Sequence, residues 1–310
     1  MKLVSTILSC HKVDKQLFDA INSILKQTYK KYELIIIFDN PNQKDFKEIK
    51  SKYQKHKLKH KIFYYQNQIN KGLTYSLNKG IQLSKGEYIM RQDSDDISKM
   101  NRMEILVNYL NNNLNKNLVY SGVIIINENN NILKYKKNYL VINRFFSSYN
   151  YRNSISHPSI MFRKSVFNKI KYYDERFKVS QDYELIHRFL KDSRYSIGKV
   201  KKYLYELRYS QNSISYKYSK EQLINSLIII FIYNFKSIKN LVYNIDTTKG
   251  MLHIIEKNMK TKRQLSIYYS YLCYKKIPLK LLINPIFILN ILIRYLFHPN
   301  LLIKRIIRLI

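Results

Sequence analysis

The chain has 310 residues, enough for one large domain with an appendage or for two domains. Because 45% of the residues are hydrophobic and 25% are charged, the composition excludes an intrinsically disordered chain. Lysine and arginine number 55 against 21 acidic residues, a formal net charge of +34, which favours a polyanionic partner such as nucleic acid or an anionic membrane. The alternative is compositional: 29 tyrosines, six glycines and no tryptophan are typical of an AT-rich genome, which raises the lysine content without any binding purpose.

Cysteine usage and the N-terminal residues indicate the compartment. Cys10 and Cys273 are too few and too far apart for a disulfide framework or a zinc site, which favours a reducing environment. The apolar run after Lys2 meets His11 without a small-residue cleavage site, so we expect no signal peptide. The same run is expected to form a buried strand.

In the first hundred residues, short apolar runs alternate with segments of helical periodicity. The predicted strands are Leu3 to Leu8, Leu34 to Phe38, Ile62 to Tyr65 and Tyr88 to Met90, and the predicted helices are Asp14 to Gln27, Gln43 to His56 and Gly72 to Leu83. Asp14 is placed to cap the first helix. Repeated strand–helix–strand units predict an α/β fold with a mostly parallel sheet and helices on both faces. Ligands bind such sheets outside the carboxyl ends of the strands.

Beyond residue 118 the pattern is less regular. The predicted elements are a strand at Val119 to Ile126, a turn at Asn127 to Asn131, a short helix at Ser165 to Ile170, a helix at Asp182 to Leu190, and strands at Tyr195 to Val200 and Leu204 to Tyr209. After about Ser215, hydrophobic helices such as Leu223 to Tyr233 and Leu279 to Leu296 alternate with basic segments. We therefore predict one domain over residues 1–215, with halves divided near residue 100, and a helical extension over residues 216–310.

Polar residues follow the predicted strands at the edge where ligands are expected. They are Ser9 and His11 after the first strand, Asp39 after the second, and Asp93, Asp95 and Asp96 after the fourth. Three aspartates in four positions repel one another unless a cation relieves them. Their oxygens favour Mg²⁺ or Mn²⁺, which commonly bridge a diphosphate. The alternative is a solvated turn in which Asp96 to Asn101 caps the next helix.

The order of these motifs resembles glycosyltransferase family 2, the nucleotide-diphospho-sugar transferases of GT-A fold that build bacterial surface polysaccharides. The matching segments are AINSILKQTY (20–29), YELIIIFDN (32–40), NKGLTYSLNKG (70–80), SKGEYIMRQDSDDISKMNR (84–102), HPSIMFRKSVF (157–167) and SQDYELIHRFL (180–190). The resemblance covers roughly residues 1–215 in the family's order. It implies a GT-A fold, with a nucleotide-sugar half and an acceptor half, followed by the C-terminal helical extension.

The resemblance implies roles for individual carboxylates. Asp39 matches the position that accepts a hydrogen bond from the nucleobase, usually uracil, and Asp93 matches the one that binds the ribose hydroxyls. Asp95 matches the ligand of a divalent metal, Mn²⁺ or Mg²⁺, on the diphosphate. Asp182 matches the catalytic base, which implies direct displacement with inversion. Asp182 is also a common helix cap, and the two roles are compatible because the helix dipole keeps the carboxylate ionised.

Other matched positions are candidates for substrate contacts. Ser9 and His11 fall in the nucleotide-binding region, and His11 stands where an aromatic residue often stacks on the base. The candidates for acceptor or phosphate contacts are Asp96, His157, Gln181 and Arg208. Gln181 replaces the glutamate that usually precedes the catalytic aspartate. Beyond Arg208, which is kept, Ser210 takes the place of a histidine of the family. For His157, which precedes a proline, the alternative is an ordinary loop histidine.

The C-terminal third is poor in acidic residues, with 16 lysines and arginines but only three acids after residue 210. No acidic residue follows Glu256, whereas eleven lysines and arginines do. The apolar stretch Leu281 to Ile293 is too short and too interrupted to predict a transmembrane helix. The last eleven residues place Lys304, Arg305 and Arg308 on one helical arc opposite an apolar face, which is typical of an interfacial helix on an anionic membrane. The alternative is a helical subdomain that packs on the preceding domain.

The resemblance implies a metal-dependent, inverting glycosyltransferase. We expect it to transfer a sugar from a nucleotide-diphosphate donor, usually a UDP-sugar, to a hydroxyl of a glycan or lipid-linked acceptor in the synthesis of capsule, O-antigen or lipooligosaccharide. Its expected place is the cytoplasmic face of the plasma membrane, as a peripheral protein. No nucleic-acid partner is expected because no binding motif accompanies the basic residues. The alternatives are a basic membrane- or nucleic-acid-binding protein with a decayed site, and a metal-dependent phosphohydrolase that uses the aspartates.

Overall fold

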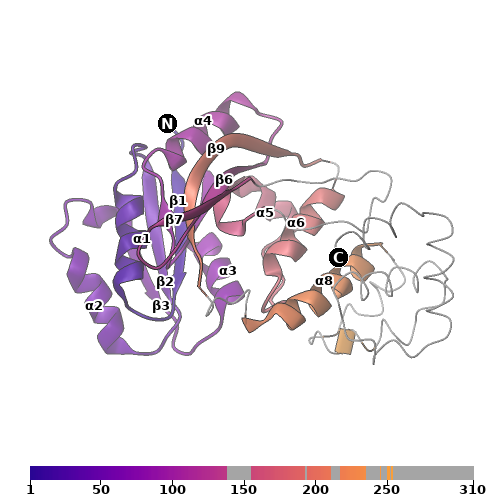
Figure 1. Cartoon of the computed structure of the whole chain (residues 1–310), viewed down its shortest axis with the longest axis horizontal. Coiled ribbons are helices and arrows are strands. Elements are labelled where there is room, and N and C mark those ends of the chain that lie inside the picture. The colour runs from indigo at the N-terminus through magenta and orange to yellow at the C-terminus, as the bar shows by residue number, and fades with distance from the viewer. Residues whose placement is uncertain are drawn as a thin grey trace, which may run out of the picture.

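The computed structural model describes residues 1–137, 155–192, 194–210 and 217–234, together with positions 245, 250, 251 and 253. Within these ranges the chain forms a nine-stranded mixed sheet with helices packed against it (Figure 1). The strand order is β3-β2-β1-β4-β8-β6-β9-β5, and β7 pairs with β6 outside this path. The predicted α/β fold is confirmed. The predicted helix Leu279 to Leu296, Cys273 and the basic last eleven residues lie outside the described residues.

The first half of the sheet is parallel. Its strands are β1 (Val4–Cys10), β2 (Tyr32–Phe38), β3 (Ile62–Gln66) and β4 (Tyr88–Asp93); its helices are α1 (Lys15–Leu25), α2 (Gln43–Tyr53) and α3 (Leu73–Leu83), with a 3₁₀ turn at Lys59–Lys61. β1 lies between β2 and β4, and β2 continues to β3, all in parallel register. The predicted elements of this half are confirmed. So is the helix cap, because the Asp14 carboxylate accepts a hydrogen bond from the Leu17 N–H at 2.9 Å.

The second half of the sheet is mixed. Its strands are β5 (Ile97–Ser98), β6 (Leu118–Ile126), β7 (Ile132–Lys136), β8 (Ile160–Arg163) and β9 (Ile197–Arg208); its helices are α4 (Arg102–Asn112), α5 (Phe167–Ile170), α6 (Gln181–Lys191) and α8 (Ser219–Asn234), with 3₁₀ turns at His157–Ser159 and Lys164–Val166. β8 runs antiparallel to both β4 and β6 and so joins the two halves. The sequence did not predict β7 or β8.

The prediction of two strands at Tyr195 to Val200 and Leu204 to Tyr209 is wrong, because β9 is one continuous strand of 12 residues. Lys201 and Lys202 are both exposed, so the strict alternation of buried and exposed side chains is lost at this point. The register between β6 and β9 shifts beside Gly122. An irregularity of this kind turns two successive side chains toward solvent without ending the strand, and a pattern of polarity alone mistakes it for a loop.

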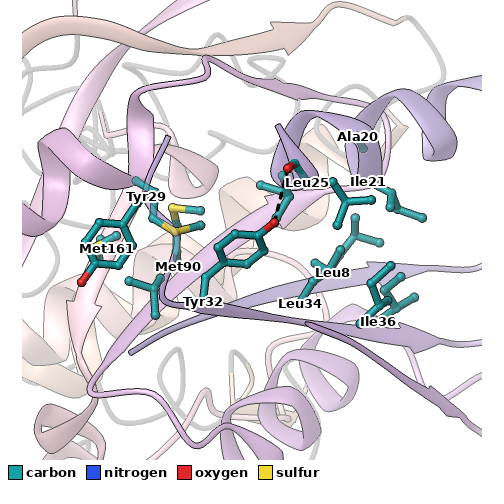
Figure 2. Packing of buried hydrophobic residues seen from close by; sticks show 14 of the residues in the cluster. Leu8, Ala20, Ile21, Leu25, Tyr29, Tyr32, Leu34, Ile36, Met90 and Met161 are labelled. Atoms are coloured by element: carbon teal, nitrogen blue, oxygen red, sulfur yellow. Dashed lines mark hydrogen bonds between the residues drawn. The ribbon is translucent and has the colours of Figure 1, made fainter. Parts of the chain in front are cut away.

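Two buried apolar clusters lie on opposite faces of the sheet. The larger one includes Leu8 and packs α1, α2 and α4 against the strands (Figure 2). The other includes Ile7 and packs α3, α5 and α6 on the other face. Neighbouring residues of β1 thus enter different clusters, as expected for a strand covered on both faces. α3 lies close to β1, because a Cβ atom at Gly80 would be 2.4 Å from Cγ2 of Ile7.

α8 is the described part of the extension, and it packs beside α6 (Figure 1). The side chains of Ile228, Ile229, Phe231 and Ile232 are buried. This helix therefore corresponds to the alternative in which the extension packs on the preceding domain. Among the described residues, no helix combines the length and the hydropathy needed to cross a bilayer.

Candidate functional site

Asp39 follows β2 and orders the loop that precedes α3. Its Oδ1 accepts hydrogen bonds from the Asn67 side chain at 2.7 Å and from the Lys71 amide at 2.8 Å, and its Oδ2 accepts one from the Gly72 amide at 2.7 Å. Gly72 has φ +86°, a left-handed conformation that favours glycine. The Asp39 side chain is only 4% exposed. It lies at the predicted edge of the sheet, and Oδ2, which accepts one of these hydrogen bonds, can still accept a further one.

The loop between β1 and α1 lies beside Asp39. The Asn40 side chain donates a hydrogen bond to the His11 carbonyl at 2.8 Å, and Ser9 of β1 lies opposite Asp93 of β4 in the parallel register. A polar cleft of about 430 Å³ opens next to this loop and is lined by Lys12, Asp14, Lys15, Gln16, Asp19, Glu128, Asn129 and Asn130. The pairing of β1 with β4 thus brings Ser9 next to Asp93, and the loop borders a cavity large enough for part of a charged ligand.

Asp93 ends β4 and forms an ion pair with Arg91. The distance from Nη2 of Arg91 to Oδ1 of Asp93 is 2.7 Å, and the Arg91 side chain is 12% exposed. The Asp93 amide donates a hydrogen bond to the Tyr205 hydroxyl of β9 at 3.1 Å. An ion pair held largely out of water is strengthened by the low local dielectric. The orientation of the Asp93 carboxylate is therefore set by Arg91.

His157 connects Arg91 to Tyr173. Nδ1 of His157 contacts Nη1 of Arg91, and its Nε2 lies 2.7 Å from the Tyr173 hydroxyl. Burial, and then the Arg91 charge, lowers the pKa of His157 well below its usual 6.5, so the imidazole is neutral at pH 7. At the other end of this row, burial raises the pKa of Tyr173, and the charge of Asp182 adds to this effect while that of Arg91 opposes it.

The groups around Arg91 also shift its pKa. Burial acts to lower the pKa of Arg91, but the charges of Asp93, Tyr173, Tyr205 and Asp182 together hold it above its ordinary value. The row Arg91–His157–Tyr173 therefore starts at Asp93, which ends β4. The charges of Asp93 and Asp182, 89 residues apart in the sequence, both act on Arg91.

Arg208, at the end of β9, binds the loop that contains Asp95 and Asp96. Its Nε donates to the Asp95 carbonyl at 2.8 Å, and its backbone N–H donates to Oδ1 of Asp96 at 2.7 Å. Its Nη1 donates to the carbonyls of Asn127 and Glu128 in the β6–β7 turn, both at 2.8 Å. The buried guanidinium thus fixes two loops, and Asp96 points toward β9 and not toward the start of α4.

Asp95, the predicted metal ligand, lies among other negative charges. Burial, and then the negative charge of Asp93, raises its pKa, whereas Arg208 and Lys12 lower it; burial also raises the pKa of Asp96 well above its ordinary value. A divalent cation would relieve this crowding of negative charge. Within the described ranges, no three His, Cys, Asp or Glu side chains gather as a metal centre. Oxygen from Asp95, with the other ligands from diphosphate and water, suits Mg²⁺ or Mn²⁺.

α6 presents Asp182 from its first turn. Ser180 precedes the helix with φ 66° and ψ 18°, a left-handed conformation that is uncommon for a residue other than glycine. Gln181 is buried and Asp182 is half-buried. The N-terminal end of a helix favours a negative charge, and Asp182 lies in the first turn of α6. The expected helix is confirmed, with the aspartate one residue inside its start.

The buried residues that support the site were not predicted. Arg102 of α4 donates from Nη1 to the Ser98 hydroxyl at 2.7 Å and from Nη2 to the Arg91 carbonyl at 3.1 Å. Its guanidinium lies 4.6 Å from the centre of the Tyr205 ring, and the side chain is fully buried. It therefore holds the end of β4, where Asp93 lies. One signal was visible in the sequence: Arg91 directly follows the apolar residues Ile89 and Met90 within one strand.

Comparison with known sequences agrees with this geometry. A family model described as glycosyl transferase family 2 matches residues 5–171. An uncharacterized glycosyltransferase of Methanocaldococcus jannaschii is 34% identical over 208 residues, which cover 66% of this chain and 70% of the relative. The O-antigen biosynthesis glycosyltransferase WbnJ of Escherichia coli is 35% identical over 196 residues, which cover 62% of this chain and 73% of WbnJ.

Solved structures show the same fold. S. aureus TarS in complex with UDP-GlcNAc matches with a TM-score of 0.58 at 15% sequence identity, over 88% of this chain and 80% of that chain. In a longer TarS structure the match covers 48% of that chain, with a TM-score of 0.56. At this level of identity the likeness concerns the fold.

Proposed function

The chain belongs to glycosyltransferase family 2, and we propose that it transfers a sugar from a UDP-sugar to a hydroxyl of a glycan or lipid-linked acceptor, with inversion and with a divalent metal. The observation that supports this proposal is the row of contacts that leads from Asp93 through Arg91 and His157 to Tyr173. The name of WbnJ, an O-antigen biosynthesis enzyme, supports a role in cell-surface polysaccharide synthesis. The UDP-GlcNAc complex of TarS supports a uridine donor.

The nucleotide half would hold the donor. Asp39 would accept a hydrogen bond from the uracil while it keeps the Lys71 and Gly72 amides in place. Asp93, held by Arg91 at 2.7 Å, would accept hydrogen bonds from the ribose hydroxyls. His11 is exposed and would stack on the base, and Ser9 would line the floor beside Asp93. These contacts fix the donor's orientation before transfer, which reduces the entropic part of the barrier.

Asp95 would hold the metal at the diphosphate. Its pKa is raised by burial and by Asp93, so binding a cation there also relieves repulsion between the two carboxylates. A bound divalent cation stabilises the negative charge that develops on the leaving diphosphate. Arg208 keeps the Asp95 main chain in place through its hydrogen bond of 2.8 Å to the Asp95 carbonyl. The Asp96 carboxylate accepts a hydrogen bond from the Arg208 backbone N–H.

Asp182 would act as the general base. It would take the proton from the acceptor hydroxyl as the oxygen bonds to the anomeric carbon and the bond to the diphosphate breaks. Attack from the side opposite the leaving group inverts the anomeric configuration. A base of this kind contributes on the order of 10² to 10⁴ in rate. Gln181, buried beside it, leaves the acceptor side with one fewer negative charge than a glutamate at this position would give.

A nucleotide-release assay tests the proposal. The purified chain, with detergent extract of bacterial membranes as the source of acceptors, is incubated with UDP-glucose, UDP-galactose, UDP-GlcNAc or GDP-mannose, with Mn²⁺ or with EDTA. We expect UDP release from a UDP-sugar that requires Mn²⁺ and is lost in Asp95→Asn. Release of inorganic phosphate from the same donors without sugar transfer, or full activity in EDTA, would contradict it.

We also propose that the chain acts as a peripheral protein on the cytoplasmic face of the plasma membrane. The support is the sequence of the extension, in which eleven lysines and arginines follow the last acidic residue, Glu256. Basic side chains near an anionic leaflet each contribute on the order of 1 kcal/mol. A membrane position would bring the site close to a lipid-linked acceptor.

A further inference from the structure

We propose that α8, the first helix of the extension, positions the catalytic base. The inference rests on the proposed role of Asp182 and adds that the extension takes part in building the site. It starts from the turn before α6. Ser180 adopts a left-handed conformation with φ 66°, and its side chain makes no capping hydrogen bond to α6. Such a conformation persists only where surrounding contacts hold it.

Those contacts come from α8. The Ser180 hydroxyl donates a hydrogen bond to the Gln222 carbonyl at 3.4 Å. Asn225 is buried and donates from Nδ2 to the Val179 carbonyl at 2.8 Å. The two bonds hold Val179 and Ser180, which lie three and two residues before Asp182, respectively. A hydroxyl that would ordinarily cap its own helix is instead used to join α6 to α8.

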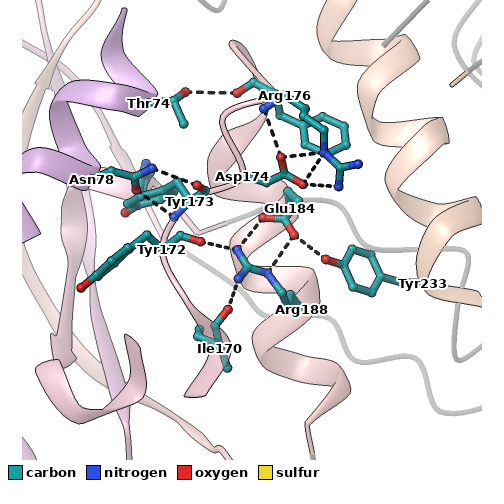
Figure 3. Close-up of polar contacts among 12 residues, drawn as sticks. Thr74, Asn78, Ile170, Tyr172, Tyr173, Asp174, Arg176, Glu184, Arg188 and Tyr233 are labelled. Carbon is teal, nitrogen blue, oxygen red and sulfur yellow. Dashed lines mark hydrogen bonds and ion pairs between the residues drawn. The ribbon is translucent and has the colours of Figure 1, made fainter. Parts of the chain in front are cut away.

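The other end of α8 binds α6 through Glu184. Figure 3 shows that its carboxylate accepts hydrogen bonds from Arg188 and from the Tyr233 hydroxyl of α8. The distances from Nε and Nη2 of Arg188 to Glu184 are 2.9 Å and 2.8 Å. The Tyr233 ring also stacks on His187 with 5.3 Å between ring centres. Glu184 is 1% exposed, and a carboxylate buried to this extent requires these partners.

The segment before α6 is held from the opposite side by α3. Thr74 donates a hydrogen bond to the Phe177 carbonyl at 3.1 Å, and Asn78 donates one to the Tyr173 carbonyl at 3.0 Å (Figure 3). α3 begins at Gly72, whose amide is bound to Asp39. The base therefore lies at the end of a segment fixed between the nucleotide half and α8. Misplacing a reacting group by about 1 Å can cost on the order of 10² in rate.

Two variants of α8 test the inference, each with a matched control. Asn225→Ala removes the bond to Val179, and Asn108→Ala makes the same change on the exposed face of α4. Tyr233→Phe removes only a hydroxyl, and Tyr218→Phe does so at a side chain that is 46% exposed. With the UDP-sugar that gives the fastest UDP release, kcat should fall about tenfold or more in the two α8 variants. The donor KM and the UDP Kd should stay within about twofold of the wild type. Both controls should match the wild type.

The outcomes separate this inference from the proposed function. If Asp182→Asn loses activity but both α8 variants keep the wild-type kcat, α8 does not position the base and the proposed function stands. If Asp182→Asn is fully active, the proposed function itself fails. If the α8 variants weaken UDP binding as much as they lower kcat, the effect is a general loss of structure and the inference is overturned. Tyr233→Phe keeps the aromatic packing, so it reports on the hydrogen bond even if Asn225→Ala does not fold.

Discussion

Arg91 is the residue on which the donor side of the site depends. Its pairing with Asp93 at 2.7 Å orients a carboxylate where the ribose is proposed to bind. We predict that Arg91→Met weakens the binding of UDP by about tenfold or more, since the unpaired carboxylate would lose this orientation. Calorimetric titration with UDP measures this effect. Arg91→Lys, which keeps the charge, should bind UDP more tightly than Arg91→Met; equal affinity of wild type and a folded Arg91→Met would contradict the assignment.

His187 makes the stability of the chain depend on pH. It is 1% exposed, and burial, followed by the Lys191 charge, lowers its pKa from 6.5 to about 4. At a pH between these two values, the His187 side chain binds a proton in the unfolded chain but not in the folded chain. The resulting stability is fully present above pH 6.5 and is lost as the pH falls toward 4, by roughly 3 kcal/mol at most. We predict that urea unfolding of His187→Phe, which keeps a ring beside Tyr233, depends less on pH over this range. An unchanged pH dependence would be the contrary result.

The sequence predicts the carboxylates of the site better than the residues that support them. Asp39, Asp93 and Asp95 each follow a strand, so their common edge follows from the parallel topology. The contact between Arg91 and His157 joins positions 66 residues apart and depends on β8, which the sequence pattern did not show. No local pattern contains such a pairing.

At the scale of elements, the close packing of α3 on β1 decides how the nucleotide half is assembled. A Cβ at Gly80 would lie 2.4 Å from Cγ2 and 3.2 Å from Cγ1 of Ile7. We predict that Gly80→Ala lowers the free energy of unfolding by about 1 to 3 kcal/mol, although alanine favours a helix over glycine by about 1 kcal/mol. Urea denaturation measures this change. A variant as stable as the wild type would show that α3 can move away from β1 without cost.

The elements that the apolar pattern predicted well are an amphipathic helix and strands that are buried on both faces. α1 and the strands β1 and β2 follow their apolar patterns closely, because tertiary packing acts on them in the same direction as local preference. β8 has only four residues, too few for a period, and all five residues of β7 are exposed, which removes the apolar signal. In β9 the adjacent exposed lysines conceal a continuous strand.

At the scale of the whole molecule, the net charge of +34 has two parts: a basic bias throughout the chain and an extension with no acid after Glu256. The proposed membrane association depends on the second part. We predict that the full chain binds vesicles of phosphatidylglycerol about tenfold or more strongly than vesicles of phosphatidylcholine, and that 0.5 M salt weakens this preference. Flotation in a density gradient measures the bound fraction. Equal binding to both kinds of vesicle would contradict the proposal.

The central claim is that a glycosyltransferase fold places Asp182 as the base for transfer from a donor held at Asp93 and Asp95. The most direct measurement compares the wild type with Asp182→Asn for the steady-state rate of UDP release and for the affinity of UDP. The account predicts a rate lower by about 10² or more in the variant, with the UDP Kd within about twofold, because Asp182 lies on the acceptor side. A variant that releases UDP as fast as the wild type, or that loses activity only because it no longer binds UDP, would contradict it.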